Sequence, residues 1–317
     1  MRRRGLLLSL LREPQLSKMP YRPDRVLAGG PQGRDAADPY FHVTVTVPEE
    51  LRDTLRSHQR DGYALLMKAA AEAIVELARD RRHVGATVGV LAVLHTWTQQ
   101  LIYHPHVHCL VTSGGVSDDG ANWRPARRAF LFPVKALAKL VRGKLRAALR
   151  KKRPDLVVPD AVWSKPWVVH CTPWGEGDEA VLDYLARYVF RVAITNSRIV
   201  GLDDEAVTIR HKHRKSNRWR TSRIPGQEFM RRFLQHVLPK GLHKVRYFGL
   251  WHPAKRKDAA RARLLLLFDR QAAPHRDRMS ADLADPEKID GTRVCPCCGA
   301  GPLLFVRQLS PKRAQGP

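Results

Sequence analysis

A chain of 317 residues, 44% of them hydrophobic, is long enough to bury a core and is not an intrinsically disordered protein. Its 56 lysines and arginines against 30 acidic residues give a formal net charge of +26, which favours a polyanion such as nucleic acid as the partner, although a ribosome-associated or heparin-binding protein would have the same composition. Five cysteines, three of them bunched near the end, exclude a secreted disulfide framework and fit a reducing cytoplasm. No apolar run reaches the roughly 18 residues of a membrane span, and we read no signal peptide.

The first expected elements are a leader, a strand, a helix and two further strands. Residues 1–38 are rich in Arg, Pro and Gly without a sustained period, which predicts a basic, loosely ordered leader. Residues 40–47 are β-branched and aromatic, which is typical of a strand. Apolar residues at helical spacing, clearest in 63–78, predict a helix, and segments 87–98 and 106–112 predict neighbouring antiparallel strands.

The second half of the chain continues this mixture of helices and strands. We expect helices over 134–150 and from 178 to about 194, with a short strand over 167–171 between them. Further strands are predicted at 207–211, 219–224 and 244–250, a helix at 227–238 and a basic helix at 254–268. The pattern alone supports only a mixture of α and β elements.

The segment 104–108 holds three histidines at alternate positions. Strand alternation puts His106 and His108 on one face while Val107 and Cys109 point into the core. Two neutral imidazoles that converge in this way suit a divalent metal, which needs at least one more ligand. Solvated histidines at a strand end would show the same pattern, as would cupins and amidohydrolases, and His104 is either a ligand or a loop residue.

Two tyrosines follow on a predicted helix. The four-residue spacing of Tyr184 and Tyr188 places both phenols on one helix face, although tyrosines at this spacing are commonly packing residues. A phenolate can attack a phosphodiester, leaving a 5′-phosphotyrosine and a free 3′-hydroxyl, when a metal polarises the scissile phosphate. The two motifs together therefore predict a metal-assisted DNA-nicking site. A hydrolytic metalloenzyme is the weaker interpretation, because the repeated strand and helix units of a barrel are not evident.

With these two motifs the chain resembles the HUH-class transposases with two catalytic tyrosines, specifically the insertion-sequence-ninety-one family. Similar stretches occur in order between residues 39 and about 255: 39–43, 94–99, 104–108, 184–197 and 247–250. Carried over position by position, His106 and His108 match the metal-binding histidines, and Tyr184 and Tyr188 match the nucleophiles. The resemblance implies a central antiparallel sheet carrying the histidines, and rolling-circle-type transposition.

The same resemblance implies cofactors and partners. The expected cofactor is Mg²⁺ or Mn²⁺ at the histidines, and the expected partner is the single-stranded end of a transposon. The expected location is the bacterial cytoplasm, near the nucleoid. A polar side chain supplies the third ligand in the wider class; Gln99 is our candidate because it lies on the β stretch before the histidine strand, with Asp183 and His95 as alternatives. A rolling-circle replication initiator or relaxase, and a catalytically inactive basic DNA-binding remnant, are the rival functions. The oligomeric state does not follow from the sequence.

We expect an α+β protein of four parts: the leader, a nicking core over 39–200, a basic β/α extension over 201–270 that binds DNA, and a tail over 271–317. Family members usually begin with a cysteine-rich zinc-binding domain, whereas residues 1–38 contain no cysteine. We therefore expect that this domain is lost or that the start is truncated, so that autonomous transposition does not follow from the resemblance.

Basic residues and a cysteine pair complete the predicted sites. Runs over 142–153 and 210–220 are candidates for phosphate contact, and a tryptophan in the second could stack on a base. The residues expected to bind DNA are Arg187, Arg210, Lys212, Arg214, Lys215, Arg218, Trp219 and Arg220. Cys295 and Cys298 form a Cys-x-x-Cys knuckle, half of a structural zinc site, for which His275 is an upstream candidate ligand; a degenerate remnant is the alternative.

Overall fold

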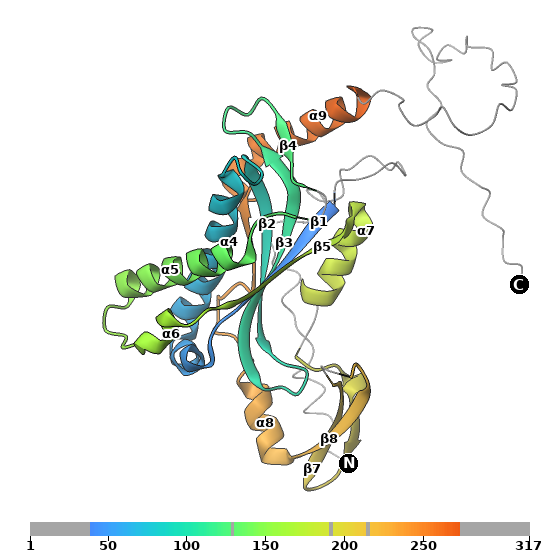
Figure 1. The fold of residues 1–317 in the computed structure, drawn as a ribbon. Coiled ribbons are helices and arrows are strands. Elements are labelled where there is room, and N and C mark those ends of the chain that lie inside the picture. Colours follow the sequence, from blue (N-terminus) through green and yellow to red (C-terminus); the bar gives the residue numbers. More distant parts are fainter. Residues whose placement is uncertain (1–38, 128–129, 190–192, 214–215, 273–317) are drawn as a thin grey trace, which may run out of the picture. The chain divides into compact units, whose positions relative to one another are not determined.

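The computed structural model describes residues 39–127, 130–189, 193–213 and 216–272 (Figure 1). The described residues from Pro39 to Arg270 belong to one compact unit. The predicted leader and the cysteine knuckle lie outside the described residues, so both stay predictions. No helix in the described part of the chain is long and apolar enough to cross a membrane.

An antiparallel sheet forms the centre of the described unit (Figure 1). Within the described residues it has six strands, five of which follow the order β5-β1-β3-β2-β9, while the short β4 pairs with the end of β3. The strands are β1 (Pro39–Thr46), β2 (Thr87–Trp97), β3 (Tyr103–Val116), β4 (Trp123–Pro125), β5 (Val168–Glu176) and β9 (Val245–Gly249). The predicted α+β class with a central antiparallel sheet is confirmed, as is the pairing of the two strands expected at 87–98 and 106–112.

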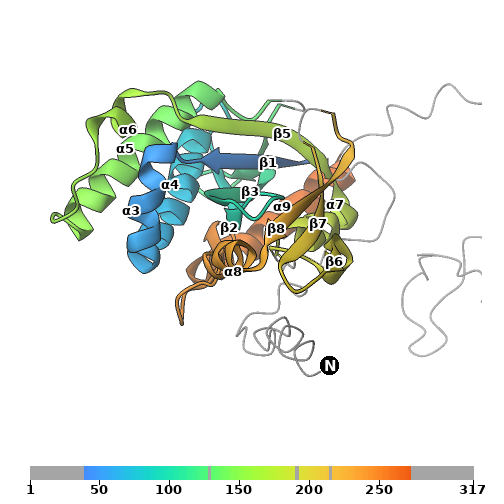
Figure 2. The ribbon, with the colours of Figure 1, turned by 90° about the horizontal axis from the view of Figure 1, so that it is seen from below.

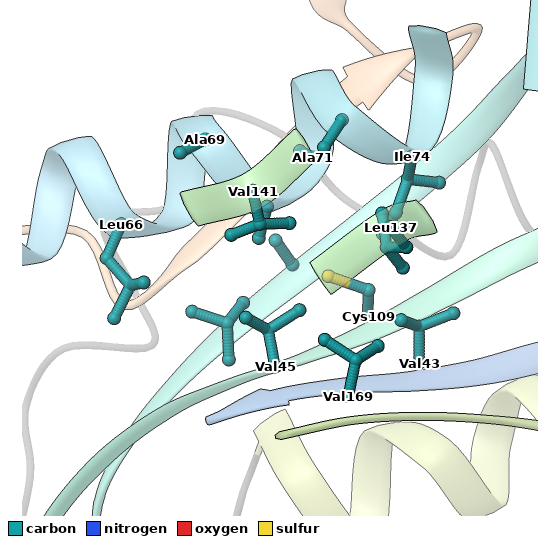
Figure 3. Packing of buried hydrophobic residues seen from close by; sticks show 14 of the residues in the cluster. Val43, Val45, Leu66, Ala69, Ala71, Ile74, Cys109, Leu137, Val141 and Val169 are labelled. Carbon is teal, nitrogen blue, oxygen red and sulfur yellow. The ribbon is translucent and has the colours of Figure 1, made fainter. Parts of the chain in front are cut away.

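One face of this sheet packs against helices through its apolar positions. The helices are α3 (Arg52–Ser57), α4 (Gln59–Arg79), α5 (Val134–Lys152) and α6 (Asp160–Ser164), with the short helix η2 (Glu49–Leu51) before α3. Figure 3 shows Val43 and Val45 of β1 and Cys109 of β3 against the small and branched side chains of α4 and α5. Alanines along α4 let that helix approach the sheet closely, and fully buried valines of the sheet pack against it.

The other face of the sheet packs against α7 (Gly177–Tyr184) and the π-helical turn η3 (Leu185–Val189) that continues it. Figure 2, seen from below, shows α3 to α6 on one side of the central sheet and α7 with the second sheet on the other. The helix predicted from 178 to about 194 is thus regular only to Tyr184, and residues 190–192 lie outside the described chain. A π turn is a rare distortion that is often found at functional sites.

A second, three-stranded antiparallel sheet follows in the described chain, in the order β6-β7-β8. Its elements are β6 (Ile199–Leu202), β7 (Ala206–Lys212) and β8 (Trp219–Pro225), preceded by the short helix η4 (Asn196–Arg198) and followed by α8 (Gly226–Leu234). The short helix η5 (Pro253–Lys255) and α9 (Arg256–Ala272) end the described part of the chain.

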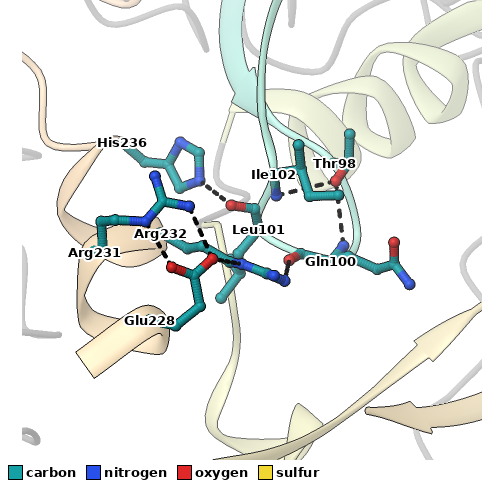
Figure 4. Close-up of polar contacts among 8 residues, drawn as sticks. All are labelled: Thr98, Gln100, Leu101, Ile102, Glu228, Arg231, Arg232 and His236. Carbon is teal, nitrogen blue, oxygen red and sulfur yellow. Dashed lines mark hydrogen bonds and ion pairs between the residues drawn. The ribbon is translucent and has the colours of Figure 1, made fainter. Parts of the chain in front are cut away.

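The tip of the β2–β3 hairpin joins the two sheets. Leu101, which has a positive φ of 60°, inserts its side chain into the apolar core beneath β7 and α8. Figure 4 shows Arg232 and His236, from α8 and the turn after it, donating to the tip carbonyls of Gln100 and Leu101, respectively. The hairpin that carries the histidines is therefore held at its tip by the second sheet and its helix.

Candidate metal and nucleophile site

The histidines of β3 lie on the sheet face that packs against α7. His104, His106 and His108 are half-buried. The alternate residues Val107 and Cys109 are fully buried on the opposite face of the sheet, which packs against α4. The alternation predicted from the sequence is confirmed, because each histidine is two residues from the next along an unbroken strand.

A third histidine joins them from the neighbouring strand. His95 of β2 is paired directly with His106 of β3, and its side chain is buried on the same face. One ring nitrogen from each of His95, His106 and His108 lies within 4.8 Å of the others. Since metal–nitrogen bonds are about 2.1 Å long, modest rotations of the rings would bring all three nitrogens onto one ion.

The second nitrogen of each ring already has a partner. His95 Nε2 donates to the Tyr188 carbonyl at 2.7 Å, and His106 Nδ1 donates to the His104 carbonyl at 2.6 Å. Because a carbonyl can only accept, these bonds fix the tautomers with the protons on His95 Nε2 and His106 Nδ1, so that the other nitrogen of each ring is the candidate metal-binding atom. His108 Nδ1 lies 2.9 Å from Nε2 of His42, so that Nε2 of His108 is its candidate metal-binding atom. This pattern is typical of metal-binding histidines.

Burial favours the neutral form of two of the clustered histidines, His42 and His106. Desolvation lowers the pKa of His106, and desolvation together with the charge of His106 lowers the pKa of His42 to about 4. Neutral imidazole is the form that binds a cation, so the donor set fits a divalent metal at neutral pH.

Tyr188 lies against this histidine cluster. Its half-buried ring has its centroid 4.2 Å from that of His108, 4.8 Å from His42 and 5.9 Å from His95. The hydrogen bond from His95 to the Tyr188 carbonyl ties the same residue to the cluster through its backbone. The π turn places Tyr188 there, because it changes the direction of the side chains that follow α7.

Tyr184 lies on the same side of the sheet but inside the core. Its side chain is 0% exposed, its hydroxyl donates to the Leu91 carbonyl at 3.4 Å, and its ring is 4.9 Å from that of Tyr188. Burial raises the pKa of Tyr184 well above its ordinary value. The structure thus brings both predicted tyrosines to the histidine face, with only Tyr188 partly accessible.

Gln99 lies beyond the end of β2, in the exposed turn of the hairpin. Its side-chain oxygen accepts from the Lys212 backbone nitrogen at 2.8 Å, and its carbonyl accepts from Arg198. Asp183, an alternative ligand, forms an ion pair with Arg187 at 2.7 Å. His95, the other alternative, is the one that the fold places beside His106 and His108.

The basic residues of the second sheet gather around a tryptophan. Trp219 of β8 pairs with Lys212 of β7 and is 53% exposed. The Arg210 guanidinium and the Lys212 ammonium lie 4.9 Å and 5.6 Å from the centroid of its ring. Arg218 and Arg220 are exposed beside it, whereas Arg214 and Lys215 lie outside the described residues.

Arg187 is distant in sequence from this group. Its guanidinium lies 5.4 Å from the centroid of Trp174 at the edge of the tyrosine turn. Of the predicted DNA-binding residues it is the one closest in sequence to Tyr188.

Sequence reasoning missed His42. The available signal was the alternation in 40–47, which sets His42 and Thr44 opposite Val43 and Val45. Its importance depends on the pairing of β1 with β3, which joins segments far apart in the chain.

Comparison with known proteins gives the family of the chain. Residues 89–259 match the family model described as "Putative transposase". A protein of Sinorhizobium fredii named "Putative transposase y4qJ" is 37% identical over 290 residues, which cover 84% of this chain and 73% of that protein. The chain belongs to this transposase family. The predicted resemblance to the paired-tyrosine transposases of the insertion-sequence-ninety-one family is confirmed.

A second member of the family is more distant. The transposase for insertion sequence element IS801 of Pseudomonas savastanoi pv. phaseolicola is 26% identical over 233 residues, which cover 67% of this chain and 54% of that protein. No solved structure matches the chain. Membership of the transposase family implies a DNA-processing enzyme.

Proposed function

We propose that this transposase nicks and rejoins single-stranded DNA through a 5′-phosphotyrosine on Tyr188, in rolling-circle-type transposition. The observation that carries the proposal is the position of the half-buried Tyr188 ring, 4.2 Å from the ring of a histidine that belongs to a three-histidine cluster. A nucleophile and a candidate cation site therefore lie side by side on one face of the sheet, as attack on a phosphodiester requires.

The chemistry follows from the phenol. The Tyr188 hydroxyl loses its proton and its oxygen attacks phosphorus, while the bond from phosphorus to the 3′ oxygen breaks. The 3′ oxygen takes up a proton and leaves as a hydroxyl, and the 5′ phosphate stays on the tyrosine. Attack by another 3′-hydroxyl reverses these steps, so that strands can be rejoined without ATP.

His95, His106 and His108 would hold the cation. We replace Gln99 with His95 in this role because the Gln99 amide oxygen accepts from the backbone of β7. A bound divalent cation would neutralise negative charge on the scissile phosphate as the phenolate attacks. Three imidazole donors suit Mn²⁺ better than Mg²⁺, which prefers oxygen ligands.

The two tyrosines differ in solvent exposure, and this difference supports an order in which they attack DNA. Tyr188 attacks first, since Tyr184 is completely buried against the sheet. Tyr184 can serve as the second nucleophile only after its ring leaves the core beside Leu91, a movement that binding of the first DNA strand would have to drive.

DNA reaches this site across the basic residues. We propose that Arg210, Lys212, Arg218 and Arg220 contact phosphates while the exposed face of Trp219 stacks on an unpaired base, and that Arg187 contacts DNA beside the tyrosine turn. Arg214 and Lys215, together with a zinc site at Cys295 and Cys298, stay predictions.

Covalent capture tests the proposal. The full chain is mixed with Mn²⁺ and single-stranded oligonucleotides from the DNA that flanks its gene, and the adduct is detected by denaturing electrophoresis. We expect an adduct that chelation abolishes, that Tyr188→Phe removes and that Tyr40→Phe retains, because Tyr40 lies on the same sheet face but packs against Trp251.

Other outcomes of this experiment would support one of the alternative functions or the other tyrosine. Salt-sensitive binding without any adduct would support the inactive remnant and overturn the proposal. An adduct with origin DNA in preference to transposon ends would support a replication initiator or relaxase. An adduct that persists in Tyr188→Phe and disappears in Tyr184→Phe would reverse the assigned order.

A further inference from the structure

His42 lies next to the candidate metal ligands but is not one of them. It is on β1, which runs between β5 and β3, with Thr44 paired to His108. The neighbouring Val43 and Val45 are fully buried on the helical side, so His42 lies on the face that carries the histidine cluster.

A hydrogen bond joins His42 to the cluster. Its Nε2 is 2.9 Å from Nδ1 of His108, and Thr44 Oγ1 lies 3.3 Å and 3.2 Å from these two nitrogens. One proton must lie between two ring nitrogens that are this close. When Nε2 of His108 binds a cation, Nδ1 of the same ring keeps its proton, and His42 Nε2 is the nearer of the two possible acceptors, at 2.9 Å against 3.2 Å for Thr44 Oγ1.

Packing fixes the acceptor in place. The His42 ring stacks on His108 with centroids 5.1 Å apart and planes at 20°. Trp174 lies edge-on to it at 5.0 Å, Tyr184 at 6.0 Å, and Tyr188 lies against it at 4.8 Å. Contacts on several sides leave the ring little freedom to turn, so that the nitrogen facing His108 has a defined position.

We propose that His42 is a positioning residue that orients His108 for cation binding by accepting its Nδ1 proton. The inference rests on the proposed function, because it assumes a cation at His95, His106 and His108. His42 touches neither the cation nor the scissile phosphate in this role. The competing explanation is that the ring of His42 only fills space between Trp174 and the tyrosines.

Two variants separate these explanations. His42→Gln keeps an acceptor near the position of Nε2 but removes the ring, whereas His42→Phe keeps a ring but removes the acceptor. His170→Gln is the matched control, since His170 is an exposed histidine on the adjacent strand β5, paired with Thr44. Circular dichroism and thermal unfolding confirm that each variant is folded before it is used.

Calorimetric titration of the full chain with Mn²⁺, without DNA, gives the decisive measurement. Loss of the acceptor should weaken Mn²⁺ binding by about tenfold or more in His42→Phe, while His42→Gln and His170→Gln should stay within about threefold of the wild type. The absorption spectrum of bound Co²⁺ should change in His42→Phe alone. Equal affinities for the wild type and His42→Phe, or a larger loss in His42→Gln than in His42→Phe, would overturn the positioning role.

Failure of the proposed role of His42 can be distinguished from failure of the proposed function. A wild-type chain that binds no Mn²⁺ and forms no adduct overturns both. A wild type that binds Mn²⁺ and forms the adduct, together with an unchanged His42→Phe, overturns only the role of His42. If the role is correct, the adduct lost in His42→Phe returns when Mn²⁺ is raised in proportion to the lost affinity.

Discussion

Protonation of His236 should destabilise the protein in mild acid. The imidazole is buried after α8, where its Nε2 donates to the Leu101 carbonyl at 3.1 Å and its Nδ1 accepts from the Thr96 hydroxyl at 3.2 Å. Burial, which outweighs the bond to Leu101, lowers the pKa of His236 from 6.5 to about 4. A second proton would have to enter at the nitrogen that faces Thr96.

The lowered pKa of His236 determines the direction and the size of the change in the free energy of unfolding. The unfolded chain binds the proton more readily than the folded chain, so the stabilisation is complete above pH 6.5 and is lost as the pH falls towards about 4. Each pKa unit corresponds to about 1.4 kcal/mol, which makes the full effect about 3 kcal/mol. Between about pH 7.5 and about pH 5 the expected loss is about 2 kcal/mol.

Urea unfolding of the wild type and His236→Gln at these two pH values measures the effect. Glutamine keeps a donor and an acceptor but does not titrate, and every other histidine contributes equally to both proteins. The free energy of unfolding of the wild type should therefore fall by about 2 kcal/mol more than that of the variant on acidification. The same difference between the two proteins at both pH values would refute the reasoning.

Three further predictions concern the fold and the DNA surface. Gly249→Ala should cost about 3 kcal/mol or more in thermal unfolding, because φ is +60° and a Cβ would lie 1.9 Å from the Val88 carbonyl oxygen; an unchanged melting temperature would contradict this. Cys109→Ser should cost about 1–3 kcal/mol in urea unfolding, since a buried hydroxyl replaces a thiol in an apolar core, and full stability would argue against that burial. Trp219→Ala should weaken single-stranded DNA binding about tenfold, measured by fluorescence anisotropy, and Trp219→Phe should weaken it less; equal affinities would exclude base stacking there.

The local parts of the fold were predictable because they depend on short periods. Alternation in 106–112 was enough to assign His106 and His108 to one face and Val107 to the other, and helical spacing located α4 and the start of α7. The spacing of the tyrosines predicted that both phenols share one helix face, and both rings do pack into the same apolar cluster.

The remaining features depend on contacts that no local period encodes. His95 joins the cluster through its pairing with His106, and His42 reaches it because β1 inserts between β5 and β3. Helical spacing also cannot distinguish Tyr184 from Tyr188, since the difference in their burial arises at the π turn between them. The sequence therefore offered several candidates for the third ligand. The pairing of the strands brings one of them, His95, beside His106 and His108.

The facing positions of His95 and His106 make the candidate metal site sensitive to chain length as well as to side-chain identity. Loss or gain of one residue within β2 would carry His95 to the opposite side of the sheet and bring Leu94 or Thr96 to its place, although every histidine codon would survive. The same change in the turn at 117–122 would leave the alignment of the ligand strands intact. A degraded copy of this gene could thus keep its complete motif and still have no place for a cation.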